Sequence, residues 1–127
     1  MIQTPHENEP LVIHKHRLPH LYTKDSLLQN SQSLPPLIVE TKKPIEDLDN
    51  YSFIDFANCC IGGGSLFSAA VQEEILFAIF PEACISMGVC NEMNDDEAIS
   101  INGVLRSANY TGYGRSFRFK EEVDLFV

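Results

Sequence analysis

Two adjacent carboxylates follow a run of three glycines in this sequence. Gly62-Gly63-Gly64 is separated by seven residues from Gln72-Glu73-Glu74. A carboxyl group can protonate the oxygen that leaves a sugar and can then, as a base, activate the attacking water. The pair therefore indicates cleavage of a glycosidic bond. Acidic residues at a helix start can also simply complement the positive end of the helix dipole.

The glycine run stands between an expected strand and an expected helix. Glycine allows positive φ angles and a close approach of the backbone to a ligand. Several N–H groups of the run would then be free to point at one anion, such as a diphosphate. A purely structural tight turn explains the glycines alone equally well.

Further polar and aromatic side chains flank the glycines. Asp55 lies in an apolar run, where a buried carboxyl group needs a hydrogen bond or a charge partner; on an edge strand it would face solvent. Asn58 could bind a hydroxyl group of a substrate, or could end the strand as a turn former. Tyr110 and Tyr113 could stack on a base, although tyrosines in turns more often pack against the protein.

Periodicity and turn residues predict an α/β arrangement around these groups. Residues 1–42 are polar and broken by prolines, so we expect an irregular leader with a short helix over Tyr22–Gln29, ahead of one domain over residues 43–127. The other expected elements are a strand over 51–57, a helix over 69–80, a second helix from Pro81, strands over 98–101 and 116–119, and a turn-rich segment over 109–114.

Composition limits the partners and the compartment. A net charge of −9 disfavours binding to a nucleic-acid backbone, which needs clustered Lys and Arg. The sequence shows neither a secretory signal nor an apolar run long enough to span a bilayer, so no membrane partner is expected. Four cysteines without a secretory context favour a reducing compartment, the nucleus or the cytoplasm. The four histidines all precede residue 21, where a solvated tail is a better explanation than a metal site.

The motifs together resemble those of the poly(ADP-ribose) glycohydrolases over residues 43–119. The matching segments are Asp55-Phe56-Ala57-Asn58, Gly62-Gly63-Gly64, Gln72-Glu73-Glu74-Ile75, Pro81-Glu82 and Tyr110-Thr111-Gly112-Tyr113. Their order and spacing are specific to that family. The resemblance implies a macrodomain-like α/β fold, with a mixed sheet and flanking helices, that hydrolyses the ribose–ribose bonds of poly(ADP-ribose) and releases ADP-ribose.

The resemblance also implies roles for individual residues. Glu74 matches the acid/base, Glu73 the neighbour that holds ribose hydroxyls, and Asp55 a carboxylate that supports the site. The positions that match substrate-binding residues are Asn58, Gly62, Gly63, Gly64, Gln72, Tyr113 near the adenine and, as a weaker match, Ile45 and Glu46. No metal and no cofactor is implied. The implied partners are poly(ADP-ribose), ADP-ribose and poly(ADP-ribosyl)ated proteins, in the DNA damage response.

Two departures from the family pattern leave other functions open. Family members continue past Val127 with a second glycine-rich loop, so we expect a truncated cleft and feeble activity of the isolated chain. Cys59 stands where relatives often have a basic residue. An inactive ADP-ribose-binding module is the main alternative, and a fragment without a stable fold is the third, because missing strands would leave sheet edges open.

Overall fold

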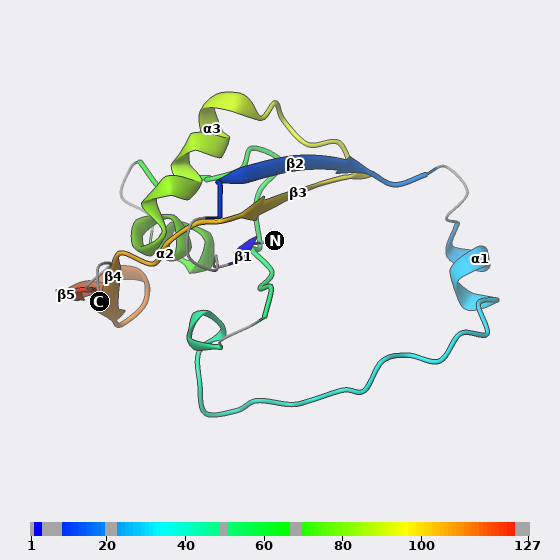
Figure 1. Cartoon of the computed structure of the whole chain (residues 1–127), viewed down its shortest axis with the longest axis horizontal. Helices are drawn as coiled ribbons and strands as arrows, with labels where there is room; N and C mark the ends of the chain where they lie inside the picture. The colour runs from blue at the N-terminus through cyan, green and yellow to red at the C-terminus, as the bar shows by residue number, and fades with distance from the viewer. Residues whose placement is uncertain (1, 4–8, 20–22, 49–50, 67–69, 124–127) are drawn as a thin grey trace.

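The computed structural model describes residues 2–3, 9–19, 23–48, 51–66 and 70–123 (Figure 1). Strands β1 (Ile2–Gln3), β2 (Val12–Arg17) and β3 (Glu97–Asn102) form one sheet, and β4 (Ala108–Thr111) and β5 (Arg118–Glu122) form a hairpin. The helices are α1 (Lys24–Leu28), α2 (Gln72–Ile79) and α3 (Ile85–Val89), with 3-10 turns at Ile45–Asp47, Pro81–Cys84 and Gly114–Ser116. No helix within these residues is long and apolar enough to cross a bilayer. The mixed α/β class is as predicted.

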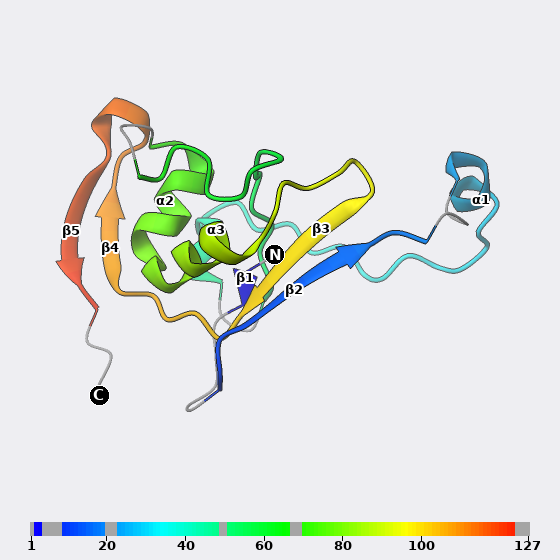
Figure 2. The same ribbon diagram turned by 90° about the horizontal axis from the view of Figure 1, so that it is seen from above.

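Helix α2 forms the centre of the core. It lies between the three-stranded sheet and the β4–β5 hairpin (Figure 2), and Ile75, Leu76, Phe77 and Ile79 are buried. The predicted helix over residues 69–80 is confirmed from Gln72 to Ile79, whereas residue 69 lies outside the described residues. The helix predicted from Pro81 is confirmed as a 3-10 turn that continues into α3.

Strand β3 organises the sheet as the sequence predicts. It pairs in antiparallel register with β2 and in parallel register with β1. Ile99 and Ile101 are buried, while Ser100 between them is partly exposed and Ala98 before them is exposed. This alternation is what made the strand predictable over residues 98–101.

The prediction of an irregular leader is wrong at β2. Its residues His14–Arg17 are exposed on the edge of the sheet, so the strand carries no apolar alternation that the sequence could reveal. Ion pairs of Lys15 with Glu97 at 2.9 Å and of Arg17 with Asp96 at 3.0 Å align it on β3. The short helix expected over Tyr22–Gln29 is confirmed as α1, although Tyr22 itself is not described. The domain boundary at residue 42 stays a prediction.

Three other expected elements differ from the structure. The strand expected over residues 51–57 is reduced to one β-bridge, between Phe53 and Ile2. The pairing partner, β1, is only two residues long, so it cannot support a longer strand. The turn-rich segment expected over residues 109–114 begins as β4, since Tyr110 and Thr111 favour strands. The strand predicted over residues 116–119 starts later, at Arg118.

Candidate active site

The two adjacent carboxylates lie in the first turn of α2 and both face the glycine loop. Glu73 is 5% exposed and Glu74 is 8% exposed. The N–H of Gly62 donates to Oε1 of Glu73 at 2.6 Å, and the N–H of Gly64 donates to Oε1 of Glu74 at 3.1 Å. Oε2 of Glu74 accepts the N–H of Val71, also at 3.1 Å. The loop thus holds two buried acidic groups that would otherwise lack partners.

The backbone of the loop requires glycine where it meets these carboxylates. Gly62 has φ +86° and Gly63 has φ +41°, both in the left-handed region. A Cβ atom at Gly63 would lie 2.5 Å from Oε2 of Glu73 and 3.1 Å from Oε1 of Glu74. Gly63 therefore makes room for the carboxylates as much as for any ligand, whereas a Cβ atom at Gly62 would meet the side chain of Met87.

The expectation that the loop leaves its N–H groups free is wrong for this structure. Those of Gly62 and Gly64 donate to the carboxylates, and that of Gly63 donates to the carbonyl of Cys60 at 3.2 Å. The carboxylates of Glu73 and Glu74 thus accept the N–H groups that an anionic ligand would otherwise accept. The assignment of the three glycines to substrate binding stays a prediction.

Asp55 adds a third carboxyl group beside the pair. Both of its oxygens are buried, and neither has a hydrogen-bond partner among the described residues. Burial, together with the negative charges of Glu73 and Glu74, raises the pKa of Asp55 to about 7. Burial also raises the pKa of Glu73, against the opposing effect of its backbone donors. The negative charges of Glu73 and Glu74 therefore make ionisation of Asp55 less favourable.

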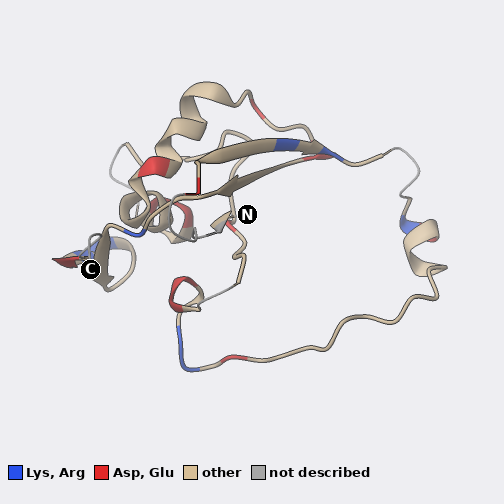
Figure 3. Ribbon diagram, viewed as in Figure 1, with Lys and Arg blue, Asp and Glu red and all other residues tan. Residues whose placement is uncertain are grey.

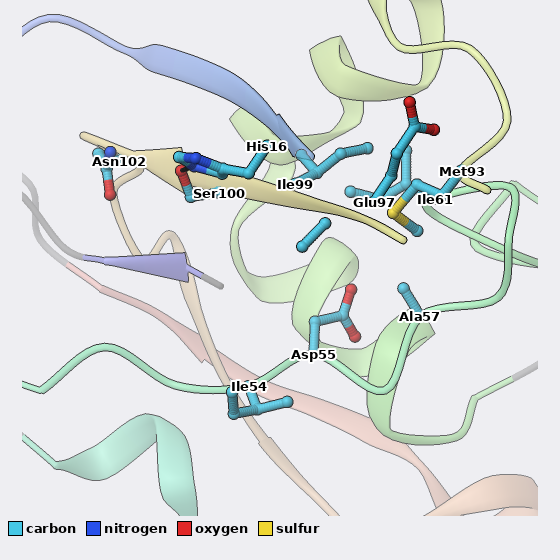
Figure 4. A pocket seen from close by; sticks show the side chains of 11 residues that line it. His16, Ile54, Asp55, Ala57, Ile61, Met93, Glu97, Ile99, Ser100 and Asn102 are labelled. Atoms are coloured by element: carbon cyan, nitrogen blue, oxygen red, sulfur yellow. Dashed lines mark hydrogen bonds between the residues drawn. The ribbon is translucent and has the colours of Figure 1, made fainter. Parts of the chain in front are cut away.

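The Asp55 side chain points into a pocket of about 540 Å³. Figure 4 shows its carboxyl group directed from the 51–57 segment toward β3, with Ala57 and Ile61 beside it. These apolar neighbours explain the desolvation of the carboxyl group. Of the two positions that the sequence left open for Asp55, the structure has the one in which its carboxyl oxygens are buried, but without the hydrogen bond expected there.

Gln72 ties the start of α2 to the segment that carries Asp55. Its side-chain oxygen accepts the N–H of Phe56 at 2.8 Å, and its side-chain nitrogen donates to the carbonyl of Ile54 at 2.9 Å. The backbone N–H of Gln72 donates to the hydroxyl oxygen of Tyr113 at 3.2 Å. Gln72 and Tyr113 are therefore brought together. In this structure the side-chain amide of Gln72 is hydrogen-bonded to the backbone of Ile54 and Phe56.

Asn58 lies on the other side of the glycine loop and is exposed. Its side-chain oxygen accepts the N–H of Cys59 at 2.6 Å and the thiol of Cys59 at 3.0 Å. The backbone N–H of Asn58 is a further hydrogen-bond donor to the Glu73 carboxylate.

The Ile45-Glu46 element contacts strand β4. The hydroxyl of Tyr110 donates to Oε1 of Glu46, and Arg106 forms an ion pair with Asp47 at 2.5 Å. Burial, followed by the neighbouring Glu46, raises the pKa of Tyr110. Ile45 and Glu46 are thereby fixed to the strand that leads to Tyr113, although no hydrogen bond links them to the carboxylates.

A second pocket, of about 430 Å³, was not foreseen from the sequence. Glu74 lies on its wall, and the opposite residues come from the turn before β5 and from β5 itself. The lining residues other than Glu74 are Ser65, Ala70, Ile75, Ala78, Gly114, Arg115, Phe117, Arg118 and Phe119. Two guanidinium groups and two aromatic rings beside a carboxylate suit an anionic ligand that carries a base. The sequence feature that could have predicted this pocket is the succession of Arg and Phe residues from Arg115 to Phe119.

Comparison with known proteins identifies relatives of this chain. The family model described as "Poly (ADP-ribose) glycohydrolase (PARG), Macro domain fold" matches residues 24–125. Poly(ADP-ribose) glycohydrolase 1 of Arabidopsis thaliana is 52% identical over 79 residues, which are 61% of this chain and 14% of that protein. Poly(ADP-ribose) glycohydrolase 1 of Caenorhabditis elegans is 41% identical over 90 residues, 71% of this chain and 12% of that protein.

A second Caenorhabditis elegans protein, poly(ADP-ribose) glycohydrolase 2, is 38% identical over 106 residues, 83% of this chain. The chain spans 22% of that protein's length. All of these matches therefore concern a limited part of longer relatives, and that part includes the carboxylates.

Proposed function

The chain belongs to the poly(ADP-ribose) glycohydrolase family, and on that premise we propose that it hydrolyses the ribose–ribose bonds of poly(ADP-ribose) and releases ADP-ribose. One observation carries the proposal most directly. Glu74 is buried, is held by two backbone N–H groups and lines a pocket that also contains Arg115 and Arg118. A positioned carboxyl group beside an anion-binding wall is what cleavage of a phosphorylated glycoside requires.

In this mechanism Glu74 acts as both acid and base. It donates a proton to the ribose oxygen that leaves the anomeric carbon, and an oxocarbenium-like species forms. A water molecule then attacks this carbon while the Glu74 carboxylate takes up a proton from the water. The proton count of Glu74 returns to its starting value, so one water molecule is consumed for each bond.

Glu73 and Asp55 support this cycle. Glu73 lies next to Glu74 on the same turn, and its carboxylate would accept hydrogen bonds from ribose hydroxyls. Asp55, with a pKa of about 7, is about half protonated at neutral pH. It therefore limits the negative charge next to the other two carboxylates, because ionising all three in a buried site is unfavourable.

The remaining pocket residues supply substrate binding. Arg115 and Arg118 would face the diphosphate, while Phe117 and Phe119 offer rings for the adenine. Tyr113, Ile45 and Glu46 would extend the adenine end, and Asn58, Gln72 and the three glycines would contact the distal ribose and the diphosphate.

The substrate determines the partners that we propose. Poly(ADP-ribosyl)ated proteins carry the polymer, and we propose that the protein acts on them in the nucleus or the cytoplasm, as part of the DNA damage response. The net charge of −9 disfavours direct binding to nucleic acid, and Arg115 and Arg118 supply positive charge for an anion at the pocket.

A binding module that does not hydrolyse the polymer is the second candidate. Both oxygens of Glu74 accept backbone N–H groups, and the residue is 8% exposed, so a leaving oxygen must reach a remaining lone pair of a buried carboxylate. If the loop does not open that approach, the pocket would bind ADP-ribose without cleaving polymer.

Incubation with purified poly(ADP-ribose) separates the two candidates. Chromatography of the products should show ADP-ribose with the wild-type sequence and none with Glu74→Gln, while calorimetry shows that both bind ADP-ribose. Binding without any product from the wild-type sequence would favour the binding module. Product formation by the variant would contradict the assignment of Glu74.

A further inference from the structure

Two thiols and one carboxylate meet beside the glycine loop. The Sγ atoms of Cys59 and Cys60 and a carboxylate oxygen of Glu92 all lie within 4.8 Å of one another. All three side chains are exposed, and both cysteines are free thiols. Across the part of the chain that the structure describes, no other group of His, Cys, Asp or Glu side chains is spaced in this way.

The fold, rather than the sequence order, brings the three together. Cys59 and Cys60 directly precede the glycine loop, whereas Glu92 belongs to the loop between α3 and β3. The backbone N–H of Met93 donates to the carbonyl of Cys59 at 2.8 Å and joins the two segments. This hydrogen bond sets Glu92 opposite the thiols.

The surroundings favour a positive ion. The hollow next to the cluster has a volume of about 930 Å³ and is also lined by Asp95, Asp96 and Arg17. Arg17 is paired with Asp96 at 3.0 Å, so its charge does not oppose a cation in the hollow. Figure 3 shows acidic positions in the loop between α3 and β3.

The donor set selects the kind of ion. Thiolates favour zinc over magnesium and calcium, which prefer oxygen ligands. Zn–S bonds of about 2.3 Å at a tetrahedral angle separate two sulfurs by about 3.8 Å. Exposed side chains already within 4.8 Å can reach this spacing by rotamer changes. Two sulfurs and one oxygen leave the fourth position to water.

We propose that Cys59, Cys60 and Glu92 bind one zinc ion and thereby link the glycine loop to the α3–β3 loop. Both thiols lose their protons to solvent, so one bound ion releases two protons. The site lies apart from Glu74 and takes no part in the bond cleavage.

The site adjoins Asn58, which is one of the proposed substrate-binding residues. The thiol of Cys59 donates to the side-chain oxygen of Asn58 at 3.0 Å, and a zinc-bound thiolate no longer has that proton. Zinc would therefore remove one of the two hydrogen bonds to this oxygen, leave the one from the backbone N–H of Cys59, and change the affinity for ADP-ribose. This consequence rests on the proposed function, whereas zinc binding itself does not.

Zinc titration of the 127-residue chain against a chromophoric chelator, with a metal-free reductant, tests the site. We expect one equivalent of Zn²⁺, about two protons released in weak buffer, and Co²⁺ absorption bands typical of thiolate ligation. The Cys59→Ser/Cys60→Ser double variant should bind Zn²⁺ at least 100-fold more weakly and lack the thiolate bands, and Glu92→Gln about 10-fold more weakly.

Cys84→Ser is the matched control, because Cys84 is partly buried and belongs to the apolar core. It should keep the wild-type zinc affinity, and circular dichroism melts should confirm that all variants fold. Wild-type affinity in the folded double variant, or less than one equivalent bound by the wild type, would overturn the proposal. An ADP-ribose affinity that zinc leaves unchanged would overturn only the link through Asn58.

Discussion

Replacing Asp55 by Asn tests the origin of the perturbed carboxyl group. Asp55 has a pKa of about 7 in the folded chain, compared with its usual 3.8. Because the folded pKa is raised, the stabilisation from the protonated group is fully present below about pH 4. It is lost as the pH rises to about 7. Asparagine keeps the shape but does not ionise, so the variant should not show this loss.

The size of the effect follows from the two pKa values. A pKa difference of this size, between 3.8 and about 7, corresponds to about 4 kcal/mol, at about 1.36 kcal/mol for each pKa unit. Asp55 is only partly removed from water, and solvent screening reduces the expected effect to about 2 kcal/mol. Relative to wild type, Asp55→Asn should therefore gain about 2 kcal/mol between pH 4 and pH 8.

Urea unfolding followed by circular dichroism at several pH values between 4 and 8.5 measures this gain. Asp95→Asn is the control, because Asp95 is exposed, and its stability difference from wild type should not change with pH by a comparable amount. A difference between Asp55→Asn and wild type that is the same at all pH values would refute the argument. It would show that Asp55 is solvated or has a hydrogen-bond partner in solution.

Three other substitutions test the loop, the helix start and the pocket. Gly63→Ala places a Cβ 2.5 Å from Oε2 of Glu73 at a φ of +41°. The variant should lose about 1–2 kcal/mol of stability in urea unfolding and have a lower hydrolytic rate. Wild-type stability and rate would contradict the loop geometry. Gln72→Ala leaves two backbone groups without their partner and should cost about 1 kcal/mol, which the same unfolding experiment measures; no change would mean that water replaces the amide. Arg115→Ala should weaken ADP-ribose binding about tenfold in calorimetry at low salt and less at high salt, with Lys120→Ala as control, and equal effects of both would argue against this pocket.

Much of the core was predictable because its pattern is local. The apolar spacing that precedes Pro81 specified α2, and the alternation of Ile99 and Ile101 specified β3. Strand β2 could not be predicted, because its exposed residues His14–Arg17 are polar and it is fixed by pairing with a distant strand. Secondary structure that depends on partners far along the chain leaves a weak signal in the sequence.

The site, like the fold, could be predicted only in part from the sequence. The motifs around Glu73 and Glu74 identified the carboxylates and their family, whereas the apolar neighbours of Asp55 left both a buried and a solvent-facing position open. The hydrogen bonds from Gly62 and Gly64 to those carboxylates depend on how the loop folds back on α2, which spacing alone does not determine. The contribution of Arg115 to the pocket wall likewise depends on the packing of the β4–β5 hairpin against α2.

The most direct test of the central claim concerns Glu74 in a complete enzyme. In a chimera, residues 51–123 replace the aligned segment of the Arabidopsis poly(ADP-ribose) glycohydrolase 1, and the release of ADP-ribose from polymer is measured. The chimera should hydrolyse the polymer, Glu121→Gln should leave its rate unchanged, and Glu74→Gln should lower the rate by about 100-fold to 10,000-fold with ADP-ribose affinity within a few-fold. A folded Glu74→Gln chimera that hydrolyses polymer at the rate of its parent would contradict the assignment of Glu74 as the acid and base.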